Sequence, residues 1–383
     1  MEGITFESLP QEIRNEILIR LSPNTLVKCI SVSKKLAATI RTKSFKELYL
    51  TRSMGRPREL FATIDDKDAT TPSEYQVLFR SLHQDQISGE QRHMISISLQ
   101  GEFMFSPPVR GLVCLQEKNK NRVVICNPGT MKFLDLPMVE ADETTKITTQ
   151  FGYDEGEDEF KVLCTKTKPK TPWENEYLVL TVGVGPGDQE PWRRLVCNVP
   201  HTPVHHGVCD RGVLYYRATK SDKSNIIMSF DVRNETFRLI PSPQDVDLNK
   251  GFWRFVNYDG KPALVVDETN EFVYEPSGGD AYLEMWELHG YSRWSKNSIL
   301  IRNWRGYAED EIKHVYRFRG TTRTKQLVFA TIMVNEEGSL VVIYYDIPTE
   351  TFTRSMVQLL GGGDDEFRFV DTFVHHVDSP MLI

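Results

Sequence analysis

Residues 230–237 read FDVRNETF, and residues 345–352 read YDIPTETF. Both segments run from a strand-like aromatic residue through an aspartate and a polar turn to a second aromatic residue. Three further segments follow a similar course: ICNPGTMKF at 125–133, GPGDQEPW at 185–192 and ELHGYSRW at 287–294. The aromatic residues that close the five segments are 59, 45, 57 and 58 residues apart: Phe133, Trp192, Phe237, Trp294 and Phe352. The chain therefore contains a structural repeat.

This spacing is close to the roughly 50-residue period of a four-stranded propeller blade. Each unit is expected to end in a hairpin, with polar residues in the turn and the aromatic residue at the start of the last strand. Five clear units and their flanking strands predict an all-β propeller of about six blades. The strand-like run 367–377 is expected to join the first blade, because ring closure removes a free sheet edge. A β-sandwich with long loops is the alternative.

The first fifty residues have a different periodicity, which is typical of short helices. Ser8-Leu-Pro-Gln11 has the form of a capping box with a proline in the first turn. The apolar residues at 9, 13, 17, 18 and 21 fall on one stripe of a helix. Ser22-Pro23 is expected to end this helix and cap a second, and the runs 32–40 and 45–50 predict a third helix and a last turn or two. So small a bundle is expected to leave apolar surface for a partner to cover.

Residues 9–45, LPQEIRNEILIRLSPNTLVKCISVSKKLAATIRTKSF, resemble an F-box, the helical module that binds the Skp-type adaptor of cullin-RING ubiquitin ligases. The resemblance covers roughly residues 4–50. Two positions depart from the family pattern: Ser22 separates Leu21 from Pro23, and Leu36 stands where tryptophan is common. The resemblance implies that nine residues build the adaptor contact or the small core behind it: Leu9, Pro10, Ile13, Ile17, Leu18, Leu21, Leu26, Cys29 and Val32.

A second resemblance covers roughly residues 95–360. The phrases RGLVCL at 110–115, ICNPGTMKFLDLP at 125–137, FGYDEGEDEFKVL at 151–163 and LEMWEL at 283–288, followed by WSK at 294–296, are similar in kind and order to motifs of the F-box associated domain of large plant F-box families. The chain is therefore divided into an F-box at 1–50, a linker at 51–73 and an F-box associated propeller at 74–383.

Together the two resemblances imply the substrate-recognition subunit of an SCF-type ubiquitin ligase. The F-box would bind the adaptor, and through it the cullin and RING subunits, while the propeller would hold an unidentified target protein. Such a subunit is not an enzyme, since it acts by raising the local concentration of the target. A binding module or decoy that engages no cullin complex is the alternative, motivated by Leu36. A propeller enzyme is a second alternative, and it would need carboxylates or histidines gathered at the ring axis.

Composition and charge restrict the function further. No apolar run approaches the roughly 18 residues of a membrane span, and the N-terminus lacks the form of a secretory signal, so we expect a cytoplasmic or nuclear protein without membrane contact. The six cysteines form no C-x-x-C pair and are expected to be reduced, without zinc. Residues 1–58 have a net charge of +6 and the remainder −13, which disfavours nucleic-acid binding by the body.

Candidate chemical sites are few. The acidic run 154–159 is expected to be a hairpin turn, and GVGPG at 183–187 does not match a phosphate-binding loop. Neighbours in the doublets 205–206 and 375–376, all histidines, point to opposite sides of a strand, so neither doublet is expected to chelate a metal alone. We therefore predict no catalytic, metal or cofactor site. Candidate anchors for the target are Trp173, Trp253, Trp304, Arg254 and Arg305, with blade-core packing the commoner role of each tryptophan.

Overall fold

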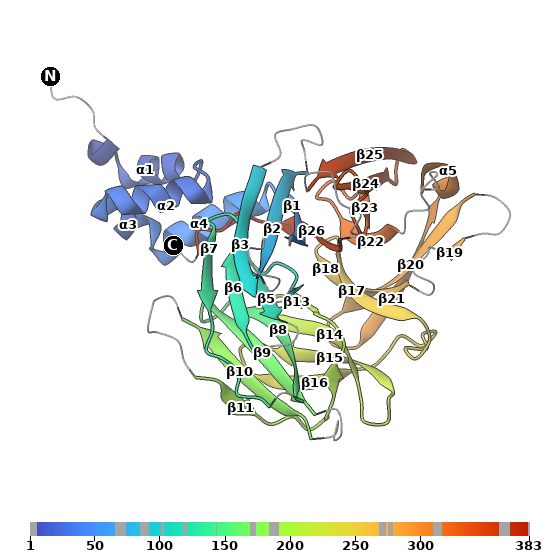
Figure 1. Ribbon diagram of the computed structural model, residues 1–383. Helices are drawn as coiled ribbons and strands as arrows, with labels where there is room; N and C mark the ends of the chain where they lie inside the picture. Colours follow the sequence, from blue (N-terminus) through green and yellow to red (C-terminus); the bar gives the residue numbers. More distant parts are fainter. Residues whose placement is uncertain are drawn as a thin grey trace.

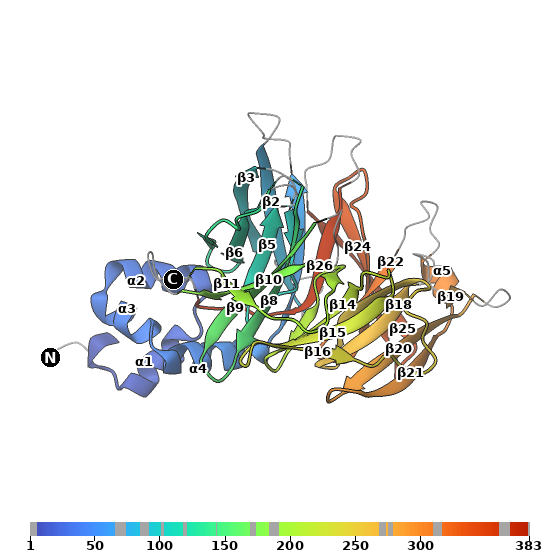
Figure 2. The same ribbon diagram turned by 90° about the horizontal axis from the view of Figure 1, so that it is seen from below.

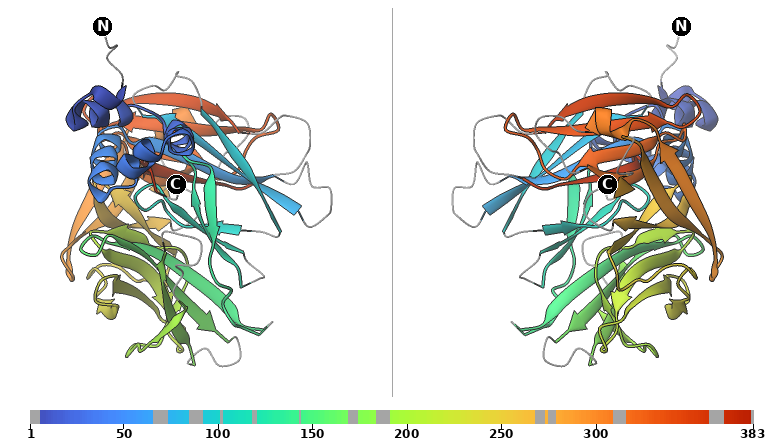
Figure 3. Two further views of the ribbon diagram at one scale, coloured as in Figure 1. Left: turned by 90° about the vertical axis from the view of Figure 1, so that its left-hand side faces the viewer. Right: turned by 90° about the vertical axis from the view of Figure 1, so that its right-hand side faces the viewer.

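Four helices precede six β-sheets in the computed structural model, which describes residues 6–65, 74–84, 92–100, 103–117, 121–142, 144–168, 174–183, 191–267, 273–274, 279–308, 316–359 and 368–381. The helices are α1 (Gln11–Leu18), α2 (Pro23–Val32), α3 (Lys34–Ile40) and α4 (Lys43–Met54). They lie on one side of the ring of sheets, in front of it in the left panel of Figure 3 and behind it in the right panel. Within the described residues, no helix is both long and apolar enough to cross a membrane.

The helix boundaries agree with the sequence in part. Ser22 caps α2 as predicted, since its side chain accepts a hydrogen bond from the Thr25 amide and Pro23 follows it. The capping box predicted at Ser8 was wrong, because Phe6–Ser8 forms a 3-10 turn and Pro10, which has no hydrogen-bonding side chain, is the N-cap of α1. The fourth helix is also longer than the predicted turn or two. The helices share a core to which each of them contributes: Leu18, Ile19, Leu26, Ile40, Phe45 and Tyr49.

Six sheets surround a common centre (Figure 1). The first sheet has the strand order β26-β1-β2-β3 and comprises β26 (Val370–His376), β1 (Arg58–Asp65), β2 (Glu74–His83) and β3 (Arg92–Gln100). The second comprises β4 (Phe103–Phe105), β5 (Val113–Glu117), β6 (Val123–Asn127) and β7 (Lys132–Asp135). The third comprises β8 (Lys146–Asp154), β9 (Glu159–Thr167), β10 (Glu176–Val182) and β11 (Arg193–Leu195).

The other three sheets complete the ring. The fourth comprises β12 (Thr202–Pro203), β13 (Val208–Asp210), β14 (Val213–Thr219), β15 (Asn225–Asp231) and β16 (Thr236–Ile240). The fifth comprises β17 (Phe252–Tyr258), β18 (Lys261–Asp267), β19 (Val273–Tyr274), β20 (Ala281–His289) and β21 (Arg293–Ile301), and a short helix α5 (Trp304–Ala308) follows it. The sixth comprises β22 (Tyr316–Thr321), β23 (Leu327–Thr331), β24 (Ser339–Asp346) and β25 (Thr351–Gln358).

The repeat identified in the sequence corresponds to the last hairpin of each sheet. Phe133, Phe237, Trp294 and Phe352 lie in β7, β16, β21 and β25, the outermost strands of four sheets. Trp192 directly precedes β11, the outermost strand of a fifth. The prediction of a propeller of about six blades is therefore confirmed.

Ring closure is made by the two ends of the propeller sequence. Strand β26 pairs antiparallel with β1, for example Phe61 with Thr372, as the strand-like C-terminal run predicted. The linker predicted at 51–73 was wrong over 51–54, which end α4, and over 58–65, which form β1. The repeat pattern missed β1 because the sheet that it joins is assembled from opposite ends of the chain. Residues 66–73 lie outside the described part of the structure.

Side chains also join neighbouring sheets at the centre of the ring. The innermost strand of a sheet has one backbone edge without a sheet partner, and its buried carbonyls need donors. In five places a glutamine or arginine donates to a carbonyl of the next sheet or its inner connection: Gln116 to Ile147, Gln150 to His205, Arg217 to Trp253, Arg254 to Phe318 and Arg319 to Val370. Each donor therefore fixes its sheet to the following one.

Helix α4 is tied to the propeller by charged and aromatic groups. Arg110 Nη2 lies 2.5 Å from Glu47 Oε1 of α4, and the Arg110 guanidinium stacks over the Tyr153 ring at 4.3 Å. The Tyr153 hydroxyl donates to Asp158 Oδ1, and Lys43 of α4 lies 3.8 Å from Asp158 Oδ2. Asp158 belongs to the turn between β8 and β9, which confirms that the acidic run 154–159 forms a hairpin turn. Figure 2 shows α4 beside the ends of these two strands.

The C-terminal tail fills the space between α4 and the propeller. Leu50 of α4 shares a buried cluster with Val377 and Met381 of the tail. Asn127 Nδ2 donates to the Ser379 and Met381 carbonyls, at 2.9 and 2.7 Å. The tail that follows the closing strand β26 therefore also supports the helical head.

We expect Gly111→Ala to loosen this junction. Gly111 has φ +85°, and an added Cβ would lie 2.5 Å from both Ser379 Cβ and the Val377 carbonyl oxygen. Gly260 is the matched control, because it has φ +77° but no neighbour within 4 Å of an added Cβ. Gly111→Ala should lower the free energy of unfolding in urea by about 3 kcal/mol and Gly260→Ala by about 1 kcal/mol. Equal losses would show that the tail is not packed against Gly111.

A buried carboxyl lies between the first and last sheets. Glu59 of β1 is buried, and its Oε2 accepts a hydrogen bond from the Tyr344 hydroxyl of β24 at 2.5 Å. Burial raises the pKa of Glu59 to about 7, although the Tyr344 hydrogen bond lowers it. The favourable neutral form is fully populated below the unfolded-state pKa, and its contribution to stability is lost as the pH rises through about 7.

Glu59→Gln should therefore stabilise the protein at high pH. The glutamine can still accept from Tyr344 but carries no charge, so at pH 8 its free energy of unfolding should exceed the wild-type value by about 2 kcal/mol. At pH 5 the difference should shrink to within about 0.5 kcal/mol. Urea unfolding at both pH values measures this, with the exposed Glu336→Gln as control. A stability difference that is the same at both pH values would contradict a raised pKa.

Candidate functional site

The helical head carries exposed apolar side chains on α1 and α2. Ile13 and Ile17 are 47% and 40% exposed, and they lie four residues apart on one face of α1. Val32, the last residue of α2, is 80% exposed. Pro10 is exposed as well, and Leu9 is half-buried. Of the nine residues named from the sequence, these five have surface to offer a partner, and half-buried Leu21 and Cys29 keep a smaller share.

The other four residues belong to the core behind that surface. Leu18 and Leu26 are buried, and Leu21 and Cys29 pack against them. Leu36, which stands where the family often has tryptophan, also packs against this core. The structure thus divides the set, which the sequence could not do because Ile17 and Leu18 are neighbours on one apolar stripe. Two further exposed apolar side chains, Leu48 and Met54, were not among the nine, and Met54 lies beyond the last turn predicted at 45–50.

The motif residues of the propeller hold the head and the tail. In addition to its bonds to the tail, Asn127 accepts at Oδ1 from the Gly129 and Thr130 amides, which shapes the turn before β7. An added Cβ on Gly129 would lie 3.0 Å from Pro23 Cγ, so the turn fits closely against the start of α2. Arg110 contacts α4. The sequence showed these motifs but not their partners, which lie far away along the chain.

The buried histidines and cysteines are poorly placed for catalysis. Burial lowers the pKa values of His206 and His376 to about 4, so both rings are neutral near pH 7. Burial likewise raises the pKa values of Cys114 and Cys164 to about 12, which leaves unreactive thiols. In the described part of the chain, no three side chains of the His, Cys, Asp or Glu types gather in a way that could hold a metal ion.

The closest approach to a catalytic pair is Cys197 with His201. Their Sγ and Nδ1 atoms are 3.8 Å apart, and His201 Nε2 lies 2.9 Å from the Tyr216 hydroxyl. Burial lowers the pKa of His201 to about 4 and raises the pKa of Cys197. An activated thiolate and imidazolium pair needs the opposite shifts, so this is a structural polar cluster.

The tryptophan candidates lie in the blade cores. Trp253 and Trp304 are buried in separate clusters, where Trp253 packs on Trp286 and Trp304 packs on Phe329. Arg254 donates to the Phe318 carbonyl of the next sheet. Trp173 and the side chain of Arg305 lie outside the described part of the structure. Neither Trp253 nor Trp304 is therefore available to a partner.

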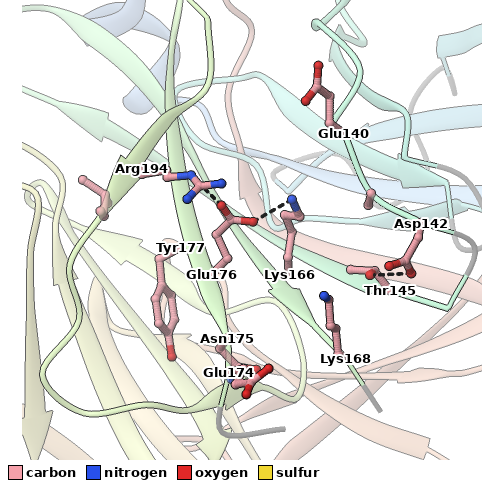
Figure 4. Close-up of a pocket in the computed structure, with 12 residues that line it drawn as sticks. Glu140, Asp142, Thr145, Lys166, Lys168, Glu174, Asn175, Glu176, Tyr177 and Arg194 are labelled. Carbon is pink, nitrogen blue, oxygen red and sulfur yellow. Dashed lines mark hydrogen bonds and ion pairs between the residues drawn. The ribbon is translucent and has the colours of Figure 1, made fainter. Parts of the chain in front are cut away.

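A groove of about 720 Å³ opens at one end of the third sheet (Figure 4). Glu176 is its central group, since Lys166 Nζ and Arg194 Nε lie 2.6 and 2.7 Å from its two carboxylate oxygens. Lys168 and Glu140 lie at the rim without an ion pair in the described part of the chain. The lining carries both charges and few apolar groups, so the groove suits a polar peptide segment better than an apolar small molecule.

Comparison with known proteins agrees with this architecture. The F-box domain model matches residues 6–48, and the F-box associated beta propeller domain model matches residues 59–377. The chain is 58% identical to the F-box protein At1g76830 of Arabidopsis thaliana over the full length of both, and 28% identical to the Arabidopsis F-box/kelch-repeat protein At3g04660 over 98% of this chain and 93% of that one. Among solved structures it is similar to TolB from Acinetobacter baumannii, with a TM-score of 0.44 and 12% identity over 88% of this chain and 72% of that one. The chain therefore belongs to the plant F-box proteins that carry an F-box associated β-propeller domain.

Proposed function

We propose that this protein is the substrate-recognition subunit of an SCF-type ubiquitin ligase, in the cytoplasm or nucleus. Its F-box would bind a Skp-type adaptor, and through it the cullin and RING subunits, and its propeller would bind the target. The observation that carries the proposal is the exposed apolar set Ile13, Ile17 and Val32 on a head whose own core is complete. A self-sufficient capping domain would have no reason to expose three large apolar side chains on so small a bundle.

The energy available from this surface is enough for a specific contact. Fully burying an isoleucine or valine side chain is worth roughly 1.5–3 kcal/mol, and exposed Leu48 adds to the apolar area. The adaptor contact would include Leu9, Pro10, Ile13, Ile17 and Val32, supported from behind by Leu18, Leu21, Leu26 and Cys29.

The head-propeller junction supports the receptor role in a second way. Glu47, Lys43 and Leu50 of α4 all contact the propeller or its tail, so the F-box is not joined to it by a loose tether. A target on the propeller would then be presented to the ubiquitin-charged enzyme in a restricted range of positions. Such positioning accelerates transfer without any catalytic group in the receptor.

The exposed apolar set can be tested by copurification with a plant Skp-type adaptor. Ile13→Asp, Ile17→Asp and Val32→Asp combined should weaken adaptor binding at least about 100-fold, because three apolar contacts are replaced by charges. The fold should survive, since all three side chains are exposed. The matched control is Leu239→Asp with Met356→Asp, which changes exposed apolar residues of the propeller and should leave binding unchanged.

Two outcomes would oppose the proposal. If the folded triple variant binds the adaptor as the wild type does, the contact lies elsewhere on the head. If the intact, folded protein binds no adaptor at all, the receptor role fails and a binding module that engages no cullin complex becomes the better function.

A further inference from the structure

Basic side chains from neighbouring sheets meet at the centre of the ring. Arg217 of β14 donates through Nη1 to the Trp253 carbonyl of β17, at 3.3 Å. The next residue of β17, Arg254, donates to the Phe318 carbonyl of β22, and Phe318 stands between Arg317 and Arg319. These hydrogen bonds place basic residues of three successive sheets beside one another.

A fourth sheet contributes Lys146, the exposed first residue of β8. Gln150 of the same strand holds the 205–207 connection, because it donates to the His205 carbonyl and accepts from the Gly207 amide. Burial lowers the pKa of His205, and the positive charges of Arg217, Arg317, Lys146 and Arg254 lower it further. The His205 imidazole thus lies close enough to basic groups of four sheets for their charges to lower its pKa. We call Lys146, His205, Arg217, Arg254 and Arg317 the axial cluster.

Two residues of this cluster, Arg217 and Lys146, can still interact with a ligand. Among the described residues, Arg217 hydrogen-bonds only neutral acceptors, Asn225 Oδ1 and the Trp253 carbonyl, and burial lowers its pKa. Of its five N–H donors, three are used in these bonds. Across the described ranges, neither Arg217 nor Lys146 forms an ion pair. The neighbouring inner strand β26 brings an acidic side chain, Asp371, which is exposed. Arg217 and Lys146 thus carry positive charge that no acidic group of the described residues pairs with, which suits a ligand of the opposite charge.

Lys146 marks the side of the cluster that faces away from the F-box, and His205 lies beside Gln150, midway along β8. Strand β8 runs from Lys146 to Asp154, and the turn that follows it contacts Lys43 of α4. Nine residues of strand span roughly 26 Å. Arg254 and Arg317 are likewise near the starts of β17 and β22. A ligand at the cluster would therefore leave the adaptor surface free.

We propose that the axial cluster binds an acidic segment of the target polypeptide, one whose negative charges come from aspartate, glutamate or phosphorylated side chains. The inference rests on the proposed function only in naming the target as the source of that segment. Charge complementarity favours a peptide over a nucleic acid, because the chain beyond residue 58 has a net charge of −13 that would repel a long polyanion away from the cluster.

The test is fluorescence anisotropy of the full-length protein without adaptor, so adaptor binding and peptide binding can fail independently. The probes are fluorescein-labelled octapeptides: oligoglutamate, a phosphoserine peptide of equal charge and neutral oligoglutamine. We expect the two acidic peptides to bind, more weakly as salt is raised, and the neutral peptide not to bind. The ratio of the two acidic affinities distinguishes carboxylate from phosphate as the preferred charge.

Variants then locate the site. Lys146→Glu, at an exposed position, should weaken acidic-peptide binding about 10-fold. Arg217→Gln should do the same, whereas Arg217→Lys, which keeps the charge, should restore most of the affinity. Lys132→Glu is the matched control, since Lys132 is also exposed, has no ion pair within the described residues and lies on the outer strand β7.

Three results would overturn the proposal. The first is that neither acidic peptide binds the folded protein. The second is that Lys132→Glu weakens binding as much as Lys146→Glu does, which would mean non-specific attraction. The third is that a single-stranded oligothymidylate of equal charge binds more tightly than the peptides and is displaced by the same variants, which would assign the cluster to nucleic acid.

Discussion

The antiparallel pairing of β26 with β1 is the contact on which the rest of the structure depends. It joins the last strand of the chain to the first sheet and leaves the ring without an open end. The same segment continues into the tail, whose carbonyls are held by Asn127 and whose Val377 and Met381 pack with Leu50 of α4. The same C-terminal segment therefore both closes the ring and supports the F-box.

Two of the motifs that identify the family, at 110–115 and 125–137, contribute residues to this junction. Arg110 pairs with Glu47, Gly111 leaves room for Ser379, and the turn at Gly129 fits against Pro23. The fold needs these contacts between the head, the tail and the propeller, whatever the target is. In the proposed receptor, target specificity then comes from other surfaces, such as the groove around Glu176 or the axial cluster.

Sequence patterns predicted the elements that are specified by residues close together in the chain. The turn residues and closing aromatics of each last hairpin revealed the blades, because a hairpin is specified within about ten residues. The missing pieces all depend on distant partners. Strand β1 was assigned to a linker because it pairs partly with β26, and the exposed and buried halves of the α1 stripe were separated only by the packing of α2, α3 and α4. Lys146, Arg217, Arg254 and Arg317 lie in four different strands that are far apart in the sequence, so only the closed ring reveals them as a group.

The arginines at the ring centre explain how one feature can serve both fold and binding. Each innermost strand needs donors for its free carbonyls, and glutamine would suffice, as Gln116 and Gln150 show in the second and third sheets. Arg217 in the fourth sheet supplies the same kind of hydrogen bond but adds a charge that no acidic side chain of the described residues pairs with. An arginine at this position is accounted for if its charge binds an acidic ligand. Because β8 places Lys146 roughly 26 Å along the strand from the turn that contacts the F-box, a target bound there would be held apart from the adaptor.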